Sequence, residues 1–403
     1  MNRRVVVTGL GVISSIGIGK KDFWNNLIQG KSGISKIEHF DTSKFNRHNG
    51  GEIKNFDPNK FIPKEMVRFL GRASRLAISS TRLALEDALI SNGDLKDKKA
   101  AVILGVTIPE GSAIDFSSEM ILKEKLDSVK RRFLLNIFSP SVSRNVGHFF
   151  KIKGINLLFP NACAAGNYSI GYGYDLIKNG EVDLAVTGGS EALSRISFQG
   201  FQSLYAMSPD ICSPFDKNRK GMLLGEGAGI LILESLERAL KRNAPIYAEV
   251  LGYGLSCDAH HITAPQREGI KKAMEKAIKN SGLSTNDIDY ISAHGTGTLQ
   301  NDKEEGGAIK ELFGSKRVPV SSIKSMLGHT MGAASAIEAI VCCLAIRDGV
   351  IPPTINFKTP DPECDVDCVP NKARKLRVKT VLNNGFAFGG NNCCVVLSRN
   401  SNG

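Results

Sequence analysis

The sequence predicts an α/β fold, and three features indicate it. Short apolar runs rich in Val, Ile and Leu recur along the 403 residues, as is typical of buried strands. Stretches with helical periodicity lie between several of these runs, and this alternation is typical of α/β architecture. A pattern of small residues followed by a helix and a glycine occurs twice, which indicates a duplicated unit.

The predicted strands are continuously apolar, which indicates sheets that are covered on both faces. The first run has two arginines before it and imitates a signal peptide. It is short, β-branched and broken by glycines, so we expect a buried strand and a turn instead. The strand-like runs cover residues 4–12, 100–106, 183–189, 229–235, 247–255, 289–297, 318–323 and 393–398.

Helices are predicted between the strands, and the repeated pattern divides the chain. The clearest helical stretches are residues 74–90, 270–281 and 303–312. The two similar units start at "NACAAG", residue 161, and at "GHTMGAA", residue 328, and each ends in a helix that is followed by glycine. Because 403 residues exceed one ordinary domain, we expect two related halves, 1–250 and 251–403.

The charge of the chain predicts an acidic partner. Fifty-two Lys and Arg face 40 Asp and Glu, for a net charge of +12. The densest basic clusters, residues 123–132 and 371–379, are accompanied by no zinc-finger, RNA-binding or basic-zipper motif. We therefore expect no nucleic-acid binding. We also expect no membrane span, because no run of 18 apolar residues is present.

The cysteines indicate a reducing compartment. Nine are present, none in a C-x-x-C pair, and the doublets at 342–343 and 393–394 lie inside apolar runs. Free, buried thiols are typical of a cytoplasmic protein rather than of a disulfide framework.

One cysteine lies in a different context. Cys163, within "NACAAG", is surrounded by small residues and directly precedes a predicted helix. The free N–H groups and the positive dipole end of that helix would favour a thiolate, and hence a nucleophile. The alternative is a small buried residue in a tight packing position, because free cysteine is often simply buried.

Two histidines in glycine- and threonine-rich loops provide possible partners. His294 lies in "AHGTGT", and His329 lies in "KSMLGHTMGAA" five residues after Lys324, while His260–His261 is a weaker candidate. One Cys and two His could bind zinc, although their spacing matches no zinc motif. A Cys-His protease would leave one histidine unexplained. Carbon–carbon bond formation on thioesters uses both, because two imidazoles can donate hydrogen bonds to a developing enolate.

A glycine-rich turn near the C-terminus is a further candidate. Phe386 and Phe388 lie within "NNGFAFGGNN", before the last predicted strand. A backbone N–H in this turn could contribute to an oxyanion hole, and a phenylalanine could act as a gate. The alternative is a plain hairpin turn with two core aromatics.

Taken together, the motifs resemble one known family nearly end to end. The chain resembles a β-ketoacyl-acyl-carrier-protein synthase of the elongating, type II-like kind, a condensing enzyme of the thiolase superfamily. The resemblance implies a thiolase fold, in which duplicated halves form a five-layered α-β-α-β-α sandwich, and a dimer. It rests on "RRVVVTGLGVISSIG", "NACAAG", "DLAVTGGSEA", "SPFDKNRKGMLLGEGAG", "DAHHITAP", "AHGTGT", "KSMLGHTMGAA" and "GFAFGGNN".

The resemblance also implies the roles of individual residues. Cys163 would be the acyl-accepting nucleophile, and His294 and His329 would be the decarboxylation pair. Lys324 would organise the hydrogen bonds of the histidines. Phe388 would be the gate of the substrate site, and the N–H groups of Phe388 and Cys163 would form the oxyanion hole. Thr296 and Thr298 would line the pantetheine channel. Ile108 and Phe201 would border the acyl pocket.

The implied reaction is decarboxylative Claisen condensation of an acyl group on Cys163 with malonyl-acyl-carrier protein. The implied partner, acyl carrier protein, is acidic, and no metal or other cofactor is expected beyond its phosphopantetheine. The pathway would be fatty-acid or specialised polyketide or polyene synthesis, by a homodimer or a heterodimer with a related subunit. Two alternatives remain: a non-catalytic chain-length partner subunit, and a thiolase-like enzyme that acts on coenzyme A.

Overall fold

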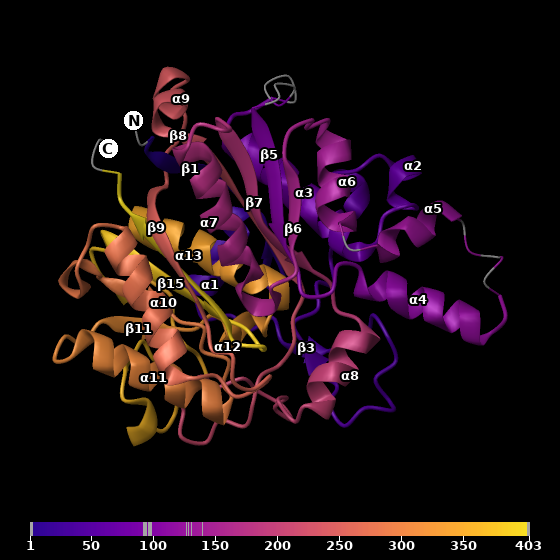
Figure 1. Ribbon diagram of the computed structural model, residues 1–403. Coiled ribbons are helices and arrows are strands. Elements are labelled where there is room, and N and C mark those ends of the chain that lie inside the picture. Colours follow the sequence, from indigo (N-terminus) through magenta and orange to yellow (C-terminus); the bar gives the residue numbers. More distant parts are fainter. Residues whose placement is uncertain are drawn as a thin grey trace.

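The computed structural model describes residues 3–91, 95, 99–125, 127, 129, 131–138 and 140–400, without the side chains of 131 and 132. The main strands form one continuous mixed sheet, whose two parts, the first and the second sheet, have helices between them and on both outer faces (Figure 1). The α/β prediction and its duplicated, five-layered form are therefore confirmed.

The first sheet is built mainly from the N-terminal half of the chain. Its strands β5, β6 and β7 are parallel, and β1 and β8 run antiparallel to each other. All ten residues of β1 are buried, as the continuous apolar run predicts. In order across the sheet, the strands are β1 (Val5–Ser14), β8 (Gly227–Ser235), β7 (Leu184–Glu191), β5 (Ala100–Gly105) and β6 (Asn156–Phe159), with the short β2 (Gly17–Ile18) beside β1.

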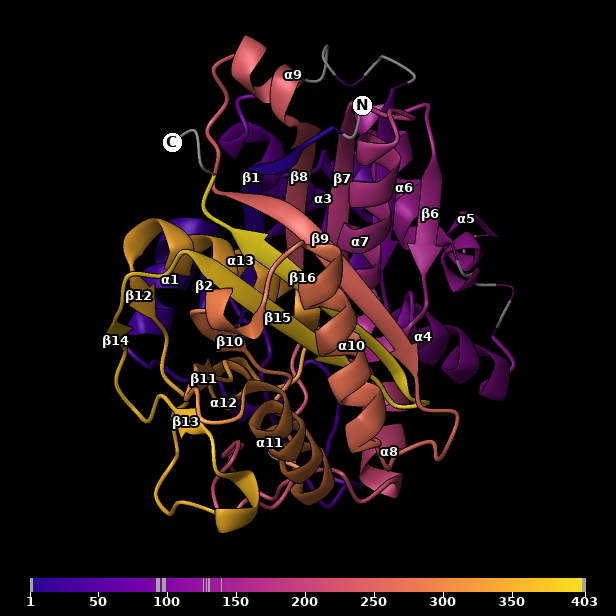
Figure 2. The same ribbon diagram turned by 60° about the vertical axis from the view of Figure 1, so that its left-hand side comes forward.

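The second sheet comes from the C-terminal half and is joined to the first along one edge. Residues Val5–Val7 of β1 pair with the first residues of β9, so the hydrogen-bonded ladder runs through both sheets (Figure 2). In order, its strands are β9 (Ala248–Cys257), β16 (Asn391–Ser398), β15 (Thr380–Phe386), β10 (Tyr290–Ser292), β11 (Pro319–Ser321) and β13 (Asp367–Cys368).

Six helices form the remaining three layers. The central helix α13 is buried from Ala334 to Ile346, as expected for a helix that is apolar on nearly every side. It packs against α7, and each of the two contacts strands of both sheets. The outer layers are α3 (Arg72–Asp87) with α6 (Ser141–Phe150), and α10 (Arg267–Asn280) with α11 (Leu299–Phe313); the central layer is α7 (Ala165–Lys178) with α13 (Ala334–Asp348).

The smaller elements cap the ends of the sandwich. They are α1 (Lys20–Ile28), α2 (Lys64–Val67), α4 (Gly111–Leu122), α5 (Arg131–Leu134), α8 (Arg195–Ser203), α9 (Leu236–Lys241), α12 (Lys324–Leu327), and the two-residue strands β3 (Ser35–Lys36), β4 (Asn49–Gly50), β12 (Val350–Ile351) and β14 (Arg374–Lys375). In the part of the chain that the structure describes, no helix has the length and hydrophobicity needed to cross a membrane.

The repeated sequence pattern forms the same local structure twice. A single 3₁₀ turn, Ala162–Ala164 or Met331–Ala333, leads directly into α7 or α13. Each turn begins at a non-glycine residue with positive φ, 49° at Ala162 and 47° at Met331. Such backbone is rare for these residue types and occurs preferentially at functional sites. The division into halves 1–250 and 251–403 stays a prediction.

Two strand predictions differ from the structure. The run 289–297 is a strand only over Tyr290–Ser292, because Gly295 and Gly297 take positive φ angles of 38° and 80° and turn the chain into a loop. The strand β15 was not expected, because it contains two asparagines and a glycine, which are uncommon in strands. It pairs with β16, so the "GFAFGG" segment is the turn of a hairpin.

Candidate active site

Cys163 and the two predicted histidines meet at the starts of the central helices. The sulfur of Cys163 lies 3.0 Å from Nε2 of His329. The rings of His329 and His294 meet edge to face, with their centroids 5.4 Å apart. The sulfur and a ring nitrogen of each histidine all lie within 4.8 Å of one another, and all three residues are buried. Residues up to 166 positions apart in the chain thus form one cluster.

The paired helix starts bring Cys163 and His329 together. Ser335, at the start of α13, donates a hydrogen bond to the carbonyl of Cys163 at 3.2 Å and accepts one from the N–H of Asn167 at 3.0 Å. A Cβ at Gly166 would come within 2.6 Å of the backbone nitrogen of Ala336, so only glycine allows this approach. The small residues around Cys163 therefore permit two helix ends to touch.

His294 is held by its backbone in the loop after β10. The buried carboxylate of Glu305 accepts the N–H groups of His294 at 2.9 Å and of Gly295 at 2.7 Å. Thr298 accepts a hydrogen bond from the N–H of Asn301 and thereby caps α11. The loop is fixed at both ends, and the imidazole of His294 projects from it toward Cys163.

Burial, rather than the helix end, controls the charge of Cys163. Burial raises the pKa of the Cys163 thiol to about 12, although Lys324 and the N–H groups of Phe388 and Cys163 lower it. The backbone N–H at the helix start does favour the thiolate, as the sequence predicts, but burial has the larger effect. Cys163 is only 3 % exposed, so a charge on its sulfur would lack solvation. The two N–H groups nevertheless point at the sulfur.

Both histidines are neutral. Burial, and then the charge of Lys324, hold the pKa of His294 and of His329 well below the ordinary value. The N–H of Met331 points at Nδ1 of His329 at 3.3 Å, so Nδ1 accepts. In a neutral imidazole the proton then lies on Nε2, which faces the sulfur. His329 is thus arranged as a hydrogen-bond donor.

The same detail argues against a zinc site. Cys163, His294 and His329 are close enough to share a metal ion. A histidine that binds a metal through Nε2 donates its Nδ1–H to an acceptor, whereas here a backbone donor faces Nδ1. Nδ1 of His294 is buried with no hydrogen-bond partner. The surroundings of the two rings do not fit metal ligation.

Lys324 lies behind the histidines rather than in the cavity. Its ammonium group is ion-paired with Glu338 of α13, and both side chains are 2 % exposed. Burial raises the pKa of Glu338 to about 7, and the charge of Lys324 opposes that rise. Burial and, after it, this positive charge lower the pKa of both imidazoles and so favour their neutral, donating form.

The cavity at Cys163 is narrow, with a volume of about 30 Å³. The rings of Phe201 and Phe388 stack beside it, with centroids 5.6 Å apart. Gly389 and Gly390 follow Phe388 with φ of 84° and 78°, a backbone conformation that glycine adopts without strain. Seven predicted site residues line the cavity: Cys163, Phe201, His294, Thr296, Thr298, His329 and Phe388.

Other predicted residues lie elsewhere. Ile108 is half-buried on the loop after β5 and does not line the cavity. His261 does line it, at the exposed end, whereas His260 does not. Of the basic cluster 123–132, residues 126, 128 and 130 and the side chains of 131 and 132 lie outside the described residues. In the cluster 371–379, Arg374 is ion-paired with Asp367.

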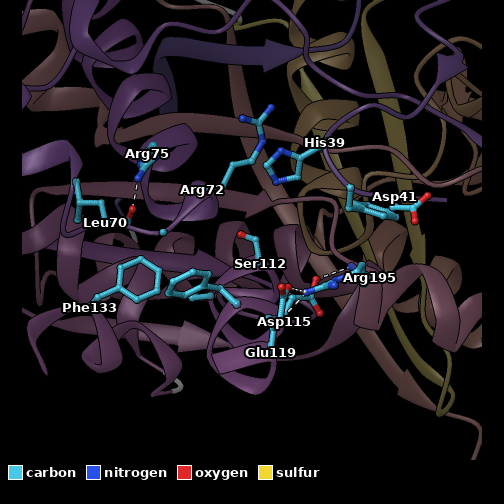
Figure 3. A pocket seen from close by; sticks show the side chains of 14 residues that line it. His39, Asp41, Leu70, Arg72, Arg75, Ser112, Asp115, Glu119, Phe133 and Arg195 are labelled. Atoms are coloured by element: carbon cyan, nitrogen blue, oxygen red, sulfur yellow. Dashed lines mark hydrogen bonds and ion pairs between the residues drawn. The ribbon is translucent and has the colours of Figure 1, made fainter. Parts of the chain in front are cut away.

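A larger cavity, of about 470 Å³, lies at the N-terminal end of α3, beside α4 and α8 (Figure 3). Arg72, Arg75 and His39 line one side of it, and Arg195, paired with Glu119, lines the other. None of the predicted site residues lines this cavity.

Sequence reasoning missed the buried residues that support the cluster. They share one signal, a polar side chain inside or at the end of an apolar strand or helix, where burial requires a partner. These residues are Glu191, Glu305, Ser335 and Glu338.

The five-layered fold with a Cys-His-His cluster at its paired helix starts defines the thiolase-like condensing class. Comparison with known proteins agrees. The models "Beta-ketoacyl synthase, N-terminal domain" and "Beta-ketoacyl synthase, C-terminal domain" match residues 2–239 and 247–358. The chain belongs to the β-ketoacyl synthase family.

Relatives and solved structures match over the whole length. The 3-oxoacyl-[acyl-carrier-protein] synthase 2 of Staphylococcus aureus (strain N315) is 40% identical over 99% of each chain. The ishigamide ketosynthase/chain length factor structure is 44% identical, with a TM-score of 0.96 and 100% coverage of both chains. A chain in the structure of AntDE:AntF, a type II PKS acyl-carrier protein in complex with its ketosynthase, matches at 32% identity and TM-score 0.92. The match covers 99% of this chain and 100% of that one.

Proposed function

We propose that the chain is a β-ketoacyl-acyl-carrier-protein synthase that lengthens acyl chains by decarboxylative Claisen condensation. The observation that carries this proposal is the Cys163 sulfur 3.0 Å from a neutral, donating imidazole, with a second neutral imidazole beside it. The family and the relatives named 3-oxoacyl-[acyl-carrier-protein] synthase 2 support it.

In the first half-reaction, the sulfur of Cys163 attacks the thioester carbonyl of an acyl group on the carrier protein. The N–H groups of Cys163 and Phe388 face the sulfur and stabilise the oxyanion of the tetrahedral intermediate. The new C–S bond to Cys163 forms, the bond to the pantetheine sulfur breaks, and the thiol proton leaves on that sulfur.

In the second half-reaction, malonyl thioester binds where the two imidazoles converge. Hydrogen bonds from His294 and His329 to its thioester oxygen stabilise the enolate that forms as carbon dioxide departs. The enolate carbon attacks the acyl carbonyl, the C–C bond forms, and the bond to Cys163 breaks. The sulfur takes up a proton, so the enzyme is restored.

The remaining residues act around this chemistry. Lys324 keeps the imidazoles neutral, and Phe388 moves aside with its glycine turn to admit the acyl group, past Phe201 and toward the Ile108 loop. Thr296 and Thr298 line the pantetheine channel. Together with the backbone N–H groups these side chains supply every step, so we propose no resident metal or cofactor beyond the phosphopantetheine of the carrier.

A product assay tests the proposal. We expect the purified chain, with acyl- and malonyl-acyl-carrier protein, to release one carbon dioxide for each β-ketoacyl product two carbons longer, as measured by mass spectrometry. Acceptance of acetyl-coenzyme A in place of both carrier substrates would favour a thiolase-like enzyme. A Cys163 inert to iodoacetamide would favour a chain-length partner subunit.

The partner for this reaction is an acidic acyl carrier protein, which the net charge of +12 would attract. Raising the salt concentration from 50 to 400 mM should raise the KM for the carrier substrate about 3- to 10-fold with little change in kcat, because exposed charges are screened. The measurement is initial rate against carrier concentration at each salt concentration. A KM independent of salt would contradict this steering.

We also propose a dimer formed at β6, as a homodimer or with a related synthase subunit. Within the described residues β6 lies at the edge of the first sheet and pairs only with β5. Leu157 on β6 and Tyr172 on α7 are each 37% exposed there, and an unpaired apolar edge favours association. Because all nine cysteines are free, we place the enzyme in the reducing cytoplasm.

A further inference from the structure

Glu191 is a buried carboxylate that the reaction above does not use. It is the last residue of β7, at the end of the strand near the active-site cluster, and it is 1 % exposed. One carboxylate oxygen accepts the N–H of Thr107 at 2.6 Å and that of Gly332 at 3.1 Å, and the other accepts the N–H of Ile108 at 3.1 Å. Glu191 thus joins its own strand to two other chain segments.

One of these segments is the turn that sets the tautomer of His329. Gly332 follows Met331, whose N–H points at Nδ1 of His329 and leaves Nε2–H facing the Cys163 sulfur. A Cβ at Gly332 would meet the backbone of Val106 at 2.4 Å, so this turn lies directly against the loop after β5. A displacement at Gly332 therefore moves the donor on which the orientation of His329 depends.

The other segment is the Thr107–Ile108 loop, whose side chain at 108 is predicted to border the acyl pocket. Both backbone N–H groups of the loop end on the same carboxylate that holds the His329 turn. The wall of the acyl pocket and the decarboxylating histidine are thus fixed to one side chain. We propose that Glu191 is a positioning residue, which sets the donor geometry of His329 by clamping the Gly332 turn to the Thr107–Ile108 loop.

The clamp depends on the reach of the side chain more than on its charge. Burial raises the pKa of Glu191 to about 7, so the neutral carboxylic acid is present near neutral pH. A glutamine has the same length, and its single amide oxygen can still accept from Thr107 and Gly332, while its NH2 group replaces the oxygen that accepts from Ile108, so that one hydrogen bond is lost. An aspartate keeps the charge but is one methylene too short to reach both the Thr107–Ile108 loop and the Gly332 turn.

The glutamine and aspartate variants form a matched pair for the test. Its kinetic measurements rest on the proposed function. We expect Glu191→Gln to keep kcat for condensation within about threefold, and Glu191→Asp and Glu191→Ala to lower kcat at least about tenfold with KM nearly unchanged. Glu110→Ala is the control, because Glu110 is also fully buried with a pKa raised to about 7, but accepts the N–H groups of Ala73 and Ser74 at the start of α3. It should lower thermal stability and leave kcat within twofold.

Several results would overturn the inference. Activity in Glu191→Asp that exceeds that in Glu191→Gln would show that charge, not reach, matters. Equal losses of kcat in Glu191→Ala and Glu110→Ala would show a purely structural role. If Glu191→Ala does not fold, the aspartate and glutamine variants decide the question.

A crystal structure of Glu191→Asp tests the inference without any measurement of activity. We expect the Gly332 nitrogen to have lost its carboxylate partner and the distance from the Met331 nitrogen to Nδ1 of His329 to exceed 3.3 Å. An unchanged turn in that structure would contradict the inference. If the wild-type chain does not catalyse the condensation, the proposed function is rejected instead, and the crystal structure alone decides whether Glu191 holds the Gly332 turn.

Discussion

Replacing Cys163 with alanine should reduce condensation at least about 10³-fold, because without the sulfur no acyl-enzyme forms. The measured quantity is kcat/KM for the acyl-carrier substrate at saturating malonyl-carrier protein. The fold should survive, since the change removes one sulfur atom beside residues that are already small.

A second buried cysteine provides the matched control. Cys343 on α13 is fully buried and free, and Cys343→Ala removes the same atom from the core. It should keep kcat/KM near the wild-type value. Condensation retained by Cys163→Ala, or lost equally in both variants, would reject Cys163 as the nucleophile.

Replacing His329 with alanine should have the second-largest effect, a loss of about 10²- to 10³-fold in malonyl decarboxylation. The variant removes the Nε2–H that faces the Cys163 sulfur and that we propose to bind the thioester oxygen, and it leaves His294 as the single imidazole donor. Acyl transfer to Cys163 should fall far less, because the oxyanion donors of that step are backbone groups. Carbon dioxide release and acyl-enzyme formation are measured separately.

His48→Ala is the control for this variant, since His48 is exposed. Within the described residues, its ring is hydrogen-bonded only to Thr42. It should leave both half-reactions unchanged. Equal losses of acyl transfer and decarboxylation in His329→Ala would contradict the assignment of His329 to the second step.

The sequence predicts the fold and the members of the site well, for physical reasons that can be named. Continuous apolar runs such as β1 and β8 have few alternatives to a covered sheet. The repeated small-residue pattern places Cys163 and His329 shortly before the starts of two helices, and the structure brings the sulfur and Nε2 to 3.0 Å of each other. The roles of these residues remain predictions.

What the sequence does not predict depends on tertiary contacts. The pKa of Cys163 is set by burial between two sheets, which outweighs the helix start visible in "NACAAG". The donor form of His329 depends on the N–H of Met331, and hence on a turn whose φ of 47° no propensity indicates. Glu191 and Glu338 become interpretable only once their partners, far apart in the chain, are known.

The acyl-enzyme itself tests the central claim most directly. The chain is incubated with acyl-carrier protein without malonyl substrate, digested, and its cysteine-containing peptides are mapped by mass spectrometry. The account predicts one acyl group per active site, on the peptide that contains Cys163, and its removal when malonyl-carrier protein is added. An acyl group on another cysteine, or product formed with Cys163 unmodified throughout, would contradict it.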